Sequence, residues 1–432
     1  MTDLLRLSNL AAVDTYEEDE FLIVRAVSKK PSMPFGCCLW NDKSRNGTKS
    51  VRFRDHAIQG QPVWLEIARQ RYRCNKCGKI SYEELPDIDA DFRATVRFRK
   101  HLAKDAIAHP FTTAATINGV HETLIRRVFN EHSTKVLDTY RPLLPRVLGM
   151  DEIYLHRTAR FVIGDVEQGM MIDMQPSRRE TDLRSYFDTM VGREKVEVVC
   201  QDMWSGYRKL TQAVFPKAVT VIDKYHVQRT ANYGMEVVRK ALYLDISNKD
   251  RVKLKRKKAL FLARQHNSKP ETLASLERVF VQYPLLRSPY ELKERFYDVY
   301  EVPDRAAAES ARNVWLASVP PEFERPFKQS IDAINNWRPH ILRYFEHRFT
   351  SGYIERLNGL IRTMDRNGAG YSFEVLRQKA LLKHGVVNKL DTVPPRPRDP
   401  DALAFMRTPR PVRVMVGMPL STLEADLEAG TF

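Results

Sequence analysis

RVLGMDEIYL, at residues 146–155, is an apolar stretch interrupted by an acidic pair, and its composition is typical of a strand. Two later stretches follow the same pattern, VEVVCQD at residues 196–202 and AVTVID at residues 218–223. Because side chains on a strand alternate between its two faces, each aspartate continues the buried face of its own stretch. We therefore predict three strands that each end on an aspartate, namely Asp151, Asp202 and Asp223.

The stretches around these strands predict a mixed sheet. RFVIGDVE and GMMIDMQ have the pattern of further strands, and helical patterns run through ETDLRSYFDTMV and GYRKLTQAVF. Hairpin strands followed by crossover helices are typical of an α/β fold in which helices cover the sheet. Ligands of such sheets bind at the carboxyl ends of adjacent strands. We therefore expect the three aspartates to meet at one edge of the sheet.

A fourth acid, Glu355, opens a helix far downstream in SGYIERLNGLIR. Residues three or four apart are neighbours on a helix, so Asn358 and Arg362 share a stripe with Glu355. We expect this polar stripe to face the aspartates. The apolar residues of the same helix form a separate stripe of Ile354, Leu357 and Ile361.

Four acids that lie at the ends of separate strands and helices suit a site for a divalent metal ion. Phosphodiester chemistry uses two ions about 3.5–4 Å apart, and Mg²⁺ suits it because it accepts carboxylate, water and phosphate oxygens. Mn²⁺ is a possible replacement. The alternative is that the aspartates are ordinary turn residues at strand ends. Glu152 is expected on the opposite face of its strand from Asp151 and is the weaker candidate.

His226 follows Asp223 by three residues in DKYHVQR. It is a candidate proton carrier or phosphate contact. The alternative is a structural histidine at the start of a helix.

The patterns divide the chain into six parts. They predict, in order, a β segment of zinc-binding type at 1–92, a helix-turn-helix domain at 93–144, the first part of a catalytic domain at 145–229, a helical insertion at 230–349, the last part of the catalytic domain at 350–390 and a proline-rich tail at 391–432.

The first part contains four of the five cysteines. Cys74 and Cys77 have the two-residue spacing that lets both thiolates reach one zinc ion. Cys37 and Cys38 are adjacent, so both can bind the same ion only if the chain makes a tight local turn there. His56 is a spare nitrogen donor. The alternative is free or buried thiols in a small β domain.

Two clusters of cations are candidate DNA contacts. In the helix-turn-helix, Asn118 and Gly119 separate the second and third helices, and the third helix offers His121, Arg126 and Arg127 to a groove. The second cluster is the run RVKLKRKK, which contains Arg251, Lys253, Lys255, Arg256, Lys257 and Lys258. The alternatives are three short helices that bind no DNA and a charge run that is only a solvated helix face.

The overall charge favours a polyanionic partner. Seventy Lys and Arg against 54 Asp and Glu give a formal net charge of +16. The sequence contains no run of 18 apolar residues, the length that a membrane-spanning helix needs, which favours nucleic acid over a membrane as the partner. The acidic start of the chain is unlike a signal peptide, so we expect a cytoplasmic, nucleoid-associated protein.

Together these features resemble the ISL-three family of bacterial insertion-sequence transposases, from about Pro34 to Leu390. The matching segments, in order, are QRYRCNKCGK before the helix-turn-helix, GMDEI, QDMWSGYRKLTQAVFPKAVTVIDKYHVQR and SGYIERLNGLIRTMDRNGAGYSFEVLRQKAL. One feature differs, because FGCCLW stands where the family usually has a spaced cysteine pair.

The resemblance implies a ribonuclease-H-like catalytic fold with a helical insertion and a triad of Asp151, Asp202 and Glu355. Asp223 and His226 match the family's Asp-x-x-His segment, and Asp223 remains a rival for the second acid. The implied function is a transposase that binds the terminal inverted repeats of an insertion sequence as a homodimer or larger assembly, and then cuts and joins double-stranded DNA. The rivals are a catalytically inactive DNA-binding regulator and a nuclease that cuts without joining.

Overall fold

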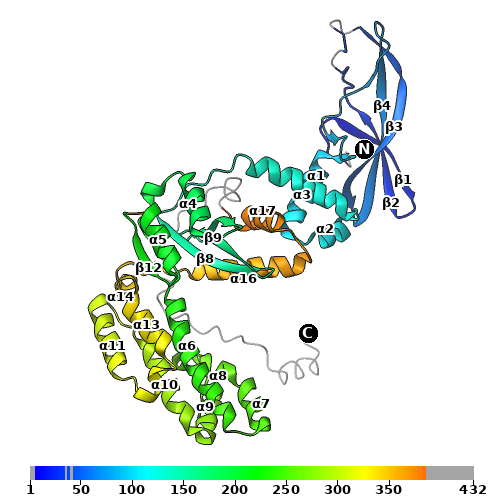
Figure 1. The fold of residues 1–432 in the computed structure, drawn as a ribbon. Helices are drawn as coiled ribbons and strands as arrows, with labels where there is room; N and C mark the ends of the chain where they lie inside the picture. Colours follow the sequence, from blue (N-terminus) through cyan, green and yellow to red (C-terminus); the bar gives the residue numbers. More distant parts are fainter. Residues whose placement is uncertain (1–4, 35–36, 39–41, 386–432) are drawn as a thin grey trace, which may run out of the picture. The chain divides into compact units, whose positions relative to one another are not determined.

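The computed structural model describes residues 5–34, 37–38 and 42–385 (Figure 1). The tail predicted at 391–432 lies outside them. Within this part of the chain, every helix is too short or too polar to cross a membrane.

The N-terminal part is a sheet of seven strands ordered β1-β2-β4-β3-β7-β6, with β5 paired to β4 (Figure 1). Alternating apolar residues of its longest strands, such as Phe53, Leu65 and Ile67, form its buried core. A β segment is what the sequence predicts for this region, although β3 and β4 are long, with 16 and 14 residues. The strands are β1 Leu10–Glu18, β2 Phe21–Ser28, β3 Lys43–Ile58, β4 Gln61–Cys74, β5 Ile80–Tyr82, β6 Ile88–Asp89 and β7 Ala94–Thr95.

Three helices follow, α1 Val96–Ala108, α2 Phe111–Asn118 and α3 Glu122–Leu137. Thr95 caps the first helix by accepting a hydrogen bond from the Phe98 N–H. Gly119 ends the second helix with φ +58°, a left-handed conformation that glycine adopts without strain. The helix-turn-helix is therefore confirmed with its predicted break.

The second sheet has five strands in the order β10-β9-β8-β11-β12. The first three are antiparallel neighbours, whereas β8, β11 and β12 run parallel. This mixed sheet is the predicted α/β fold and has the strand order of a ribonuclease-H-like domain. The strands are β8 Val147–Leu155, β9 Thr158–Asp165, β10 Met170–Gln175, β11 Val198–Gln201 and β12 Val219–Ile222.

Helices cover both faces of this sheet (Figure 1). On one face, α4 Glu180–Asp188 and α5 Ser205–Val214 pack with Leu148 and Met150 of β8. The other face carries Ile153 and Leu155 of β8 against the two last described helices, α16 Gly352–Gly368 and α17 Phe373–His384. Alternate side chains of β8 therefore contribute to two separate hydrophobic cores, one on each face of the sheet.

A long helix, α6 Lys224–Ala241, leads from β12 into a helical region (Figure 1). Its buried residues Val227 and Ala231 pack with Phe327 and Ile334 from the end of that region. The remaining helices are α7 Asn248–Arg256, α8 Lys258–Leu262, α9 Pro270–Gln282, α10 Arg287–Asp298, α11 Arg305–Ala317, α12 Pro321–Glu324, α13 Lys328–Asn336, α14 Arg338–Leu342 and α15 Tyr344–His347.

Two glycines set how closely α16 approaches the sheet. Gly149 of β8 and Gly164 of β9 face each other across the antiparallel ladder. Ile354 of α16 lies over both, because a Cβ added at Gly149 would come within 2.7 Å of Ile354 Cγ1. At Gly164 an added Cβ would also meet the Met170 carbonyl at 2.9 Å. The missing side chains therefore make the seat for the helix.

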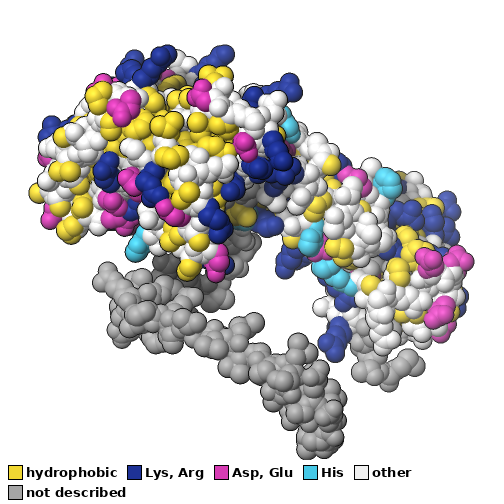
Figure 2. Space-filling model, turned by 90° about the horizontal axis from the view of Figure 1, so that it is seen from below, with side chains coloured by type: hydrophobic (Ala, Val, Ile, Leu, Met, Phe, Trp, Pro, Cys, Tyr) yellow, Lys and Arg dark blue, Asp and Glu magenta, His cyan; other side chains and the backbone are white. Residues whose placement is uncertain are grey.

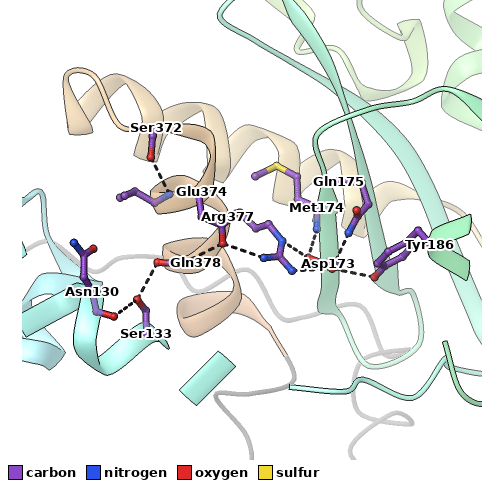
Figure 3. Close-up of polar contacts among 11 residues, drawn as sticks. Asn130, Ser133, Asp173, Met174, Gln175, Tyr186, Ser372, Glu374, Arg377 and Gln378 are labelled. Carbon is purple, nitrogen blue, oxygen red and sulfur yellow. Dashed lines mark hydrogen bonds and ion pairs between the residues drawn. The ribbon is translucent and has the colours of Figure 1, made fainter. Parts of the chain in front are cut away.

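Helix α17 ties the helix-turn-helix to the same sheet (Figure 3). Arg377 donates from Nε and Nη2 to the buried carboxylate of Asp173 in β10, at 2.7 and 3.0 Å. The Tyr186 hydroxyl of α4 donates to the same carboxylate at 2.9 Å. One residue further along α17, Gln378 accepts from Ser133 of α3 at 2.9 Å. Residues of α1, α3, the sheet and α17 accordingly share one hydrophobic core.

We predict that Gly149→Ala lowers the free energy of unfolding by about 1–3 kcal/mol, because the added methyl overpacks the seat of Ile354. Urea denaturation measures the loss. In the double variant Gly149→Ala/Ile354→Ala, the loss of stability should be smaller than the sum of the two single losses by about 0.5 kcal/mol or more. The reason is that Ile354→Ala removes the atoms with which the added methyl clashes.

Gly359→Ala is the matched control, because a Cβ there meets no atom within 4 Å on the exposed side of α16. It should leave stability unchanged or raise it by up to about 1 kcal/mol through helix propensity. Equal stability of Gly149→Ala and the parent chain would refute the packing argument.

Candidate functional site

The parallel register places the three aspartates at one level of the sheet. Cys200 of β11 pairs with Gly149 of β8 and with Val221 of β12. Two residues further along each chain lie Asp151, Asp202 and Asp223, and the Asp223 N–H donates to the Gln201 carbonyl at 3.0 Å. Three segments that are far apart in sequence thus present carboxylates side by side.

One expectation is wrong in detail, because Asp151 does not end its strand. Strand β8 continues to Leu155, and Asp151 stays paired with Val162 of the antiparallel neighbour β9. By contrast, β11 and β12 stop at Gln201 and Ile222. The hairpin partner carries β8 past its parallel neighbours, so Asp151 projects from a fixed backbone.

His226 lies among the three aspartates. Its Nε2 is 4.0 Å from Asp151 Oδ1, and its Nδ1 is 3.9 Å from Asp202 Oδ1 and 3.5 Å from Asp223 Oδ2. It stands in the first turn of α6, directly after the strand that carries Asp223. The imidazole therefore contacts the predicted acids of three strands.

The polar stripe of α16 completes the site. Asn358 Nδ2 donates to Asp151 Oδ2 at 2.8 Å and to the Glu152 carbonyl at 3.3 Å. Glu355, one turn earlier, lines the same cavity as Asp151, Asp202 and His226. The opposite stripe of Ile354, Leu357 and Ile361 is buried against the sheet, as the sequence predicts.

Burial and mutual repulsion shift the charges of these groups. Burial raises the pKa of Asp151 to about 6, although the nearby His226 opposes the shift. Burial and the charge of Asp223 raise the pKa of Glu355. Burial lowers the pKa of His226, but the nearby carboxylates of Asp223, Asp202 and Asp151 outweigh it, so the net shift is upward. The cluster therefore contains four carboxyl groups, those of Asp151, Asp202, Asp223 and Glu355, but only one histidine to balance them.

Asp202 and Asp223 have different surroundings. The side chain of Asp202 is 33% exposed and lines the cavity, whereas that of Asp223 is 1% exposed. Asp223 also caps α6 by accepting from the Tyr225 N–H at 3.4 Å. Burial would raise the pKa of Asp223, but the nearby side chains of His226 and Ser351 hold it below its ordinary value. The geometry gives Asp202 the access to a ligand and gives Asp223 a supporting position.

The cavity has further walls that the sequence reasoning did not assign. Glu152 lines the same cavity as Asp151 and accepts from Arg178 at 2.6 Å. Arg178 in turn lies over the ring of Trp204, 5.3 Å from its centroid. The only available sequence signal was the position of Trp204 two residues after an aspartate. The additional lining residues are Tyr154, Arg178, Met203, Trp204 and Arg229, and the predicted Arg362 also lies here.

The residues present fit divalent metal. The donor set consists of hard carboxylate oxygens, which Mg²⁺ prefers. Asp151, Asp202 and Glu355 line one cavity with His226, and Asp223 lies 3.5 Å from the same imidazole. Carboxylates gathered so closely repel one another, and a bound cation relieves that repulsion. Asn358 Oδ1 is buried without a hydrogen-bond partner among the described residues, which leaves another oxygen acceptor at the site.

The predicted DNA contacts of the helix-turn-helix are at the surface. Arg126 and Arg127 are exposed on α3, where they pair with Glu122 and Glu131. Their inward neighbours Ile125 and Val128 are buried. His121 precedes the helix rather than lying on its exposed face, because its Nδ1 caps α3 by accepting from the Thr123 N–H.

The basic run of the insertion is helical and faces outward. Arg251, Lys253, Lys255 and Arg256 are exposed on α7, Lys257 is half-buried between the helices, and Lys258 is exposed at the start of α8. Leu254 is the buried anchor of the run. Figure 2 shows Lys and Arg side chains dispersed over one face of the molecule, with acidic side chains between them.

The N-terminal cysteines form a separate centre. The sulfurs of Cys37, Cys38, Cys74 and Cys77 all lie within 4.8 Å of one another, and the chain bends at the adjacent pair. Backbone N–H groups of Cys77 and Lys76 lower the pKa of Cys74 to about 6, which favours the thiolate that binds zinc. Four cysteines in this arrangement support a structural zinc ion.

His56, the spare donor, packs instead against His101 at a centroid distance of 4.8 Å.

Comparisons with known proteins agree with this architecture. A family model described as a transposase matches residues 148–380, more than half of the chain. A second, the helix-turn-helix domain of transposase family ISL3, matches residues 83–133, and a third, the zinc finger of transposase IS204/IS1001/IS1096/IS1165, matches residues 36–77. The chain is also 24% identical over 346 residues to the transposase for insertion sequence element IS1001 of Bordetella parapertussis, which covers 74% of this chain and 80% of that protein.

We predict one zinc ion per chain, measured by elemental analysis of protein purified without added metal. Cys77→Ser should lose this zinc, because one of the four sulfur ligands is removed. Cys200→Ala is the control and should retain it, since Cys200 is buried in the distant sheet. Equal zinc in Cys77→Ser and the parent chain would exclude the cysteine cluster as the zinc site.

Proposed function

Because this chain belongs to the ISL3 family of transposases, we propose that it binds the terminal inverted repeats of an insertion sequence and cuts and rejoins DNA there. The observation that carries the proposal is the convergence of Asp151, Asp202 and Glu355 on one cavity from three separate elements. Helix-turn-helix and zinc-finger segments that precede this site supply the means to recognise a DNA sequence.

Asp151, Asp202 and Glu355 would hold the metal, and Mg²⁺ is the ion that the oxygen donors suit. When bound, two such ions activate an attacking oxygen and stabilise the leaving one. The remaining work falls to the protein. Asn358 fixes the orientation of Asp151 through its hydrogen bond, and His226 lies among the acids with its Nε2 4.0 Å from Asp151 Oδ1.

Two displacements at phosphorus account for the reaction. In the first, a water oxygen forms a bond to the phosphorus at the element end, and the bond to the 3′ oxygen breaks to release a 3′-hydroxyl. In the second, that hydroxyl oxygen attacks a phosphodiester of target DNA and displaces a target 3′ oxygen. Arg178, Arg229 and Arg362 line the cavity, where they offer cations to the phosphates.

Two chains or more would act together, because joining both ends of an element requires that the ends be held at once. The rival function of an inactive regulator predicts binding of the repeats without metal-dependent cutting. The rival of a simple nuclease predicts cut products without joined ones. The complete set of acids in one cavity favours catalysis over regulation alone.

We predict that Asp151→Asn, Asp202→Asn and Glu355→Gln each reduce cleavage of a terminal-repeat duplex by about 100-fold or more, because a ligand charge is lost. Gel analysis of cut and joined products in Mg²⁺ or Mn²⁺ measures both steps. Binding of the uncut duplex should be unchanged. Asp182→Asn on the exposed side of α4 is the control and should cut normally.

Asp223→Asn separates the two candidates for the second acid. We expect it to keep partial cleavage, because Asp223 contacts His226 and caps α6 instead of lining the cavity wall. Normal cutting by Asp202→Asn together with complete loss in Asp223→Asn would reverse the assignment.

A further inference from the structure

The catalytic cavity continues into a path along α6. A second hollow shares with it Asp202, Met203, His226 and Arg229. A third hollow shares Glu236, Lys240 and Lys258 with the second and adds Arg251 and Lys255 of the basic run. Three adjoining hollows therefore connect the acids to the cations of the insertion.

Helix periodicity explains why α6 forms this path. Tyr225, Arg229, Tyr233, Glu236 and Lys240 follow one another at intervals of three or four residues and lie on one stripe. The opposite stripe is buried in the helical region. At 1.5 Å per residue this stripe is about 22 Å long, which is long enough to contact several nucleotides of one strand.

The path is positively charged despite the glutamate in it. Glu236 is already compensated, because buried Arg239 donates to its two carboxylate oxygens at 2.6 and 2.8 Å. Lys258 Nζ lies 3.6 Å from the same carboxylate. Arg229 and Lys240 remain exposed along the stripe. A phosphate backbone therefore meets a surplus of cations.

Exposed tyrosines alternate with these cations. Tyr225 and Tyr233 are 46% and 51% exposed, although aromatic side chains are usually buried. Cations that track a backbone, together with aromatic rings that stack on bases, are typical of grooves that bind single-stranded nucleic acid. A base pair inside a duplex would offer these rings no free face.

We infer that this path binds an unpaired strand of DNA that leaves the catalytic acids and runs along α6 towards the basic run. The inference rests on the proposed function, since it takes the strand to be the one next to the cut phosphodiester. It assigns base stacking to Tyr233 and phosphate binding to Arg229, Lys240 and Lys258. These roles are separate from metal binding by the acids.

The test compares three labelled DNAs by fluorescence anisotropy. One is a terminal-repeat duplex that stops at the cleavage position, one carries a single-stranded extension beyond it, and one carries a duplex extension. The parent chain should bind the single-stranded extension more tightly than the blunt DNA. Tyr233→Ala should weaken binding of the single-stranded extension by about five-fold or more, because a stacking ring is lost. Lys240→Ala should reduce the slope of log binding constant against log salt concentration by about 0.7, because one phosphate contact is lost.

Two controls fix the interpretation. Tyr233→Phe keeps the ring and should bind like the parent chain, whereas Lys217→Ala removes an exposed lysine outside the path and should change nothing. Both tested side chains are exposed, so thermal unfolding should show unchanged stability. Unaltered binding of the extension by Tyr233→Ala and Lys240→Ala would overturn the inference.

The remaining outcomes separate this inference from the proposed function. An equal effect of Tyr233→Ala on the duplex extension would replace single-strand binding with duplex binding. Normal cutting with no dependence on Tyr233 or Lys240 would remove the path and leave the transposase chemistry intact. Absence of cutting by the parent chain, with the predicted loss in Tyr233→Ala, would keep the path and remove the chemistry.

Discussion

The contact between Ile354 and the paired glycines of β8 and β9 is the constraint on which the site depends. Glu355 and Asn358 reach the aspartates only because α16 lies close to the strands, and the helix lies close only because Gly149 and Gly164 lack side chains. The same turn of helix that buries Ile354 in the core presents Glu355 to the cavity. Packing and chemistry are therefore set by adjacent residues.

A second set of contacts joins the helix-turn-helix to the sheet that carries the aspartates. Lys379 of α17 is buried, and its Nζ donates to the His109 carbonyl at 2.7 Å and to the Tyr371 hydroxyl at 3.1 Å. Arg377 and Gln378 on the same helix bind Asp173 of the sheet and Ser133 of α3 (Figure 3). Because a buried pair that loses one partner costs several kcal/mol, these contacts resist separation of the two parts. The helix-turn-helix and the sheet that carries the acids are therefore held together through α17.

The sequence predicted most of the sheet because its strands are short, apolar and β-branched, and because their aspartates recur in one pattern. It also predicted the break at Gly119 and the two stripes of α16. It misplaced Asp151 at a strand end, since strand length depends on pairing with β9, a tertiary contact that periodicity does not contain. The seat of Ile354 was missed for the same reason, because it is formed by segments that sequence order keeps far apart.

The insertion between Asp202 and Glu355 has a consequence for synthesis of the protein. The helix-turn-helix and the first acids leave the ribosome early, whereas α16 and α17 follow only after every helix of the insertion. A nascent or truncated chain that stops before Gly352 lacks both Glu355 and the helices that complete the shared core. Under the proposed function, the segment that completes the catalytic site is therefore synthesised after the helix-turn-helix.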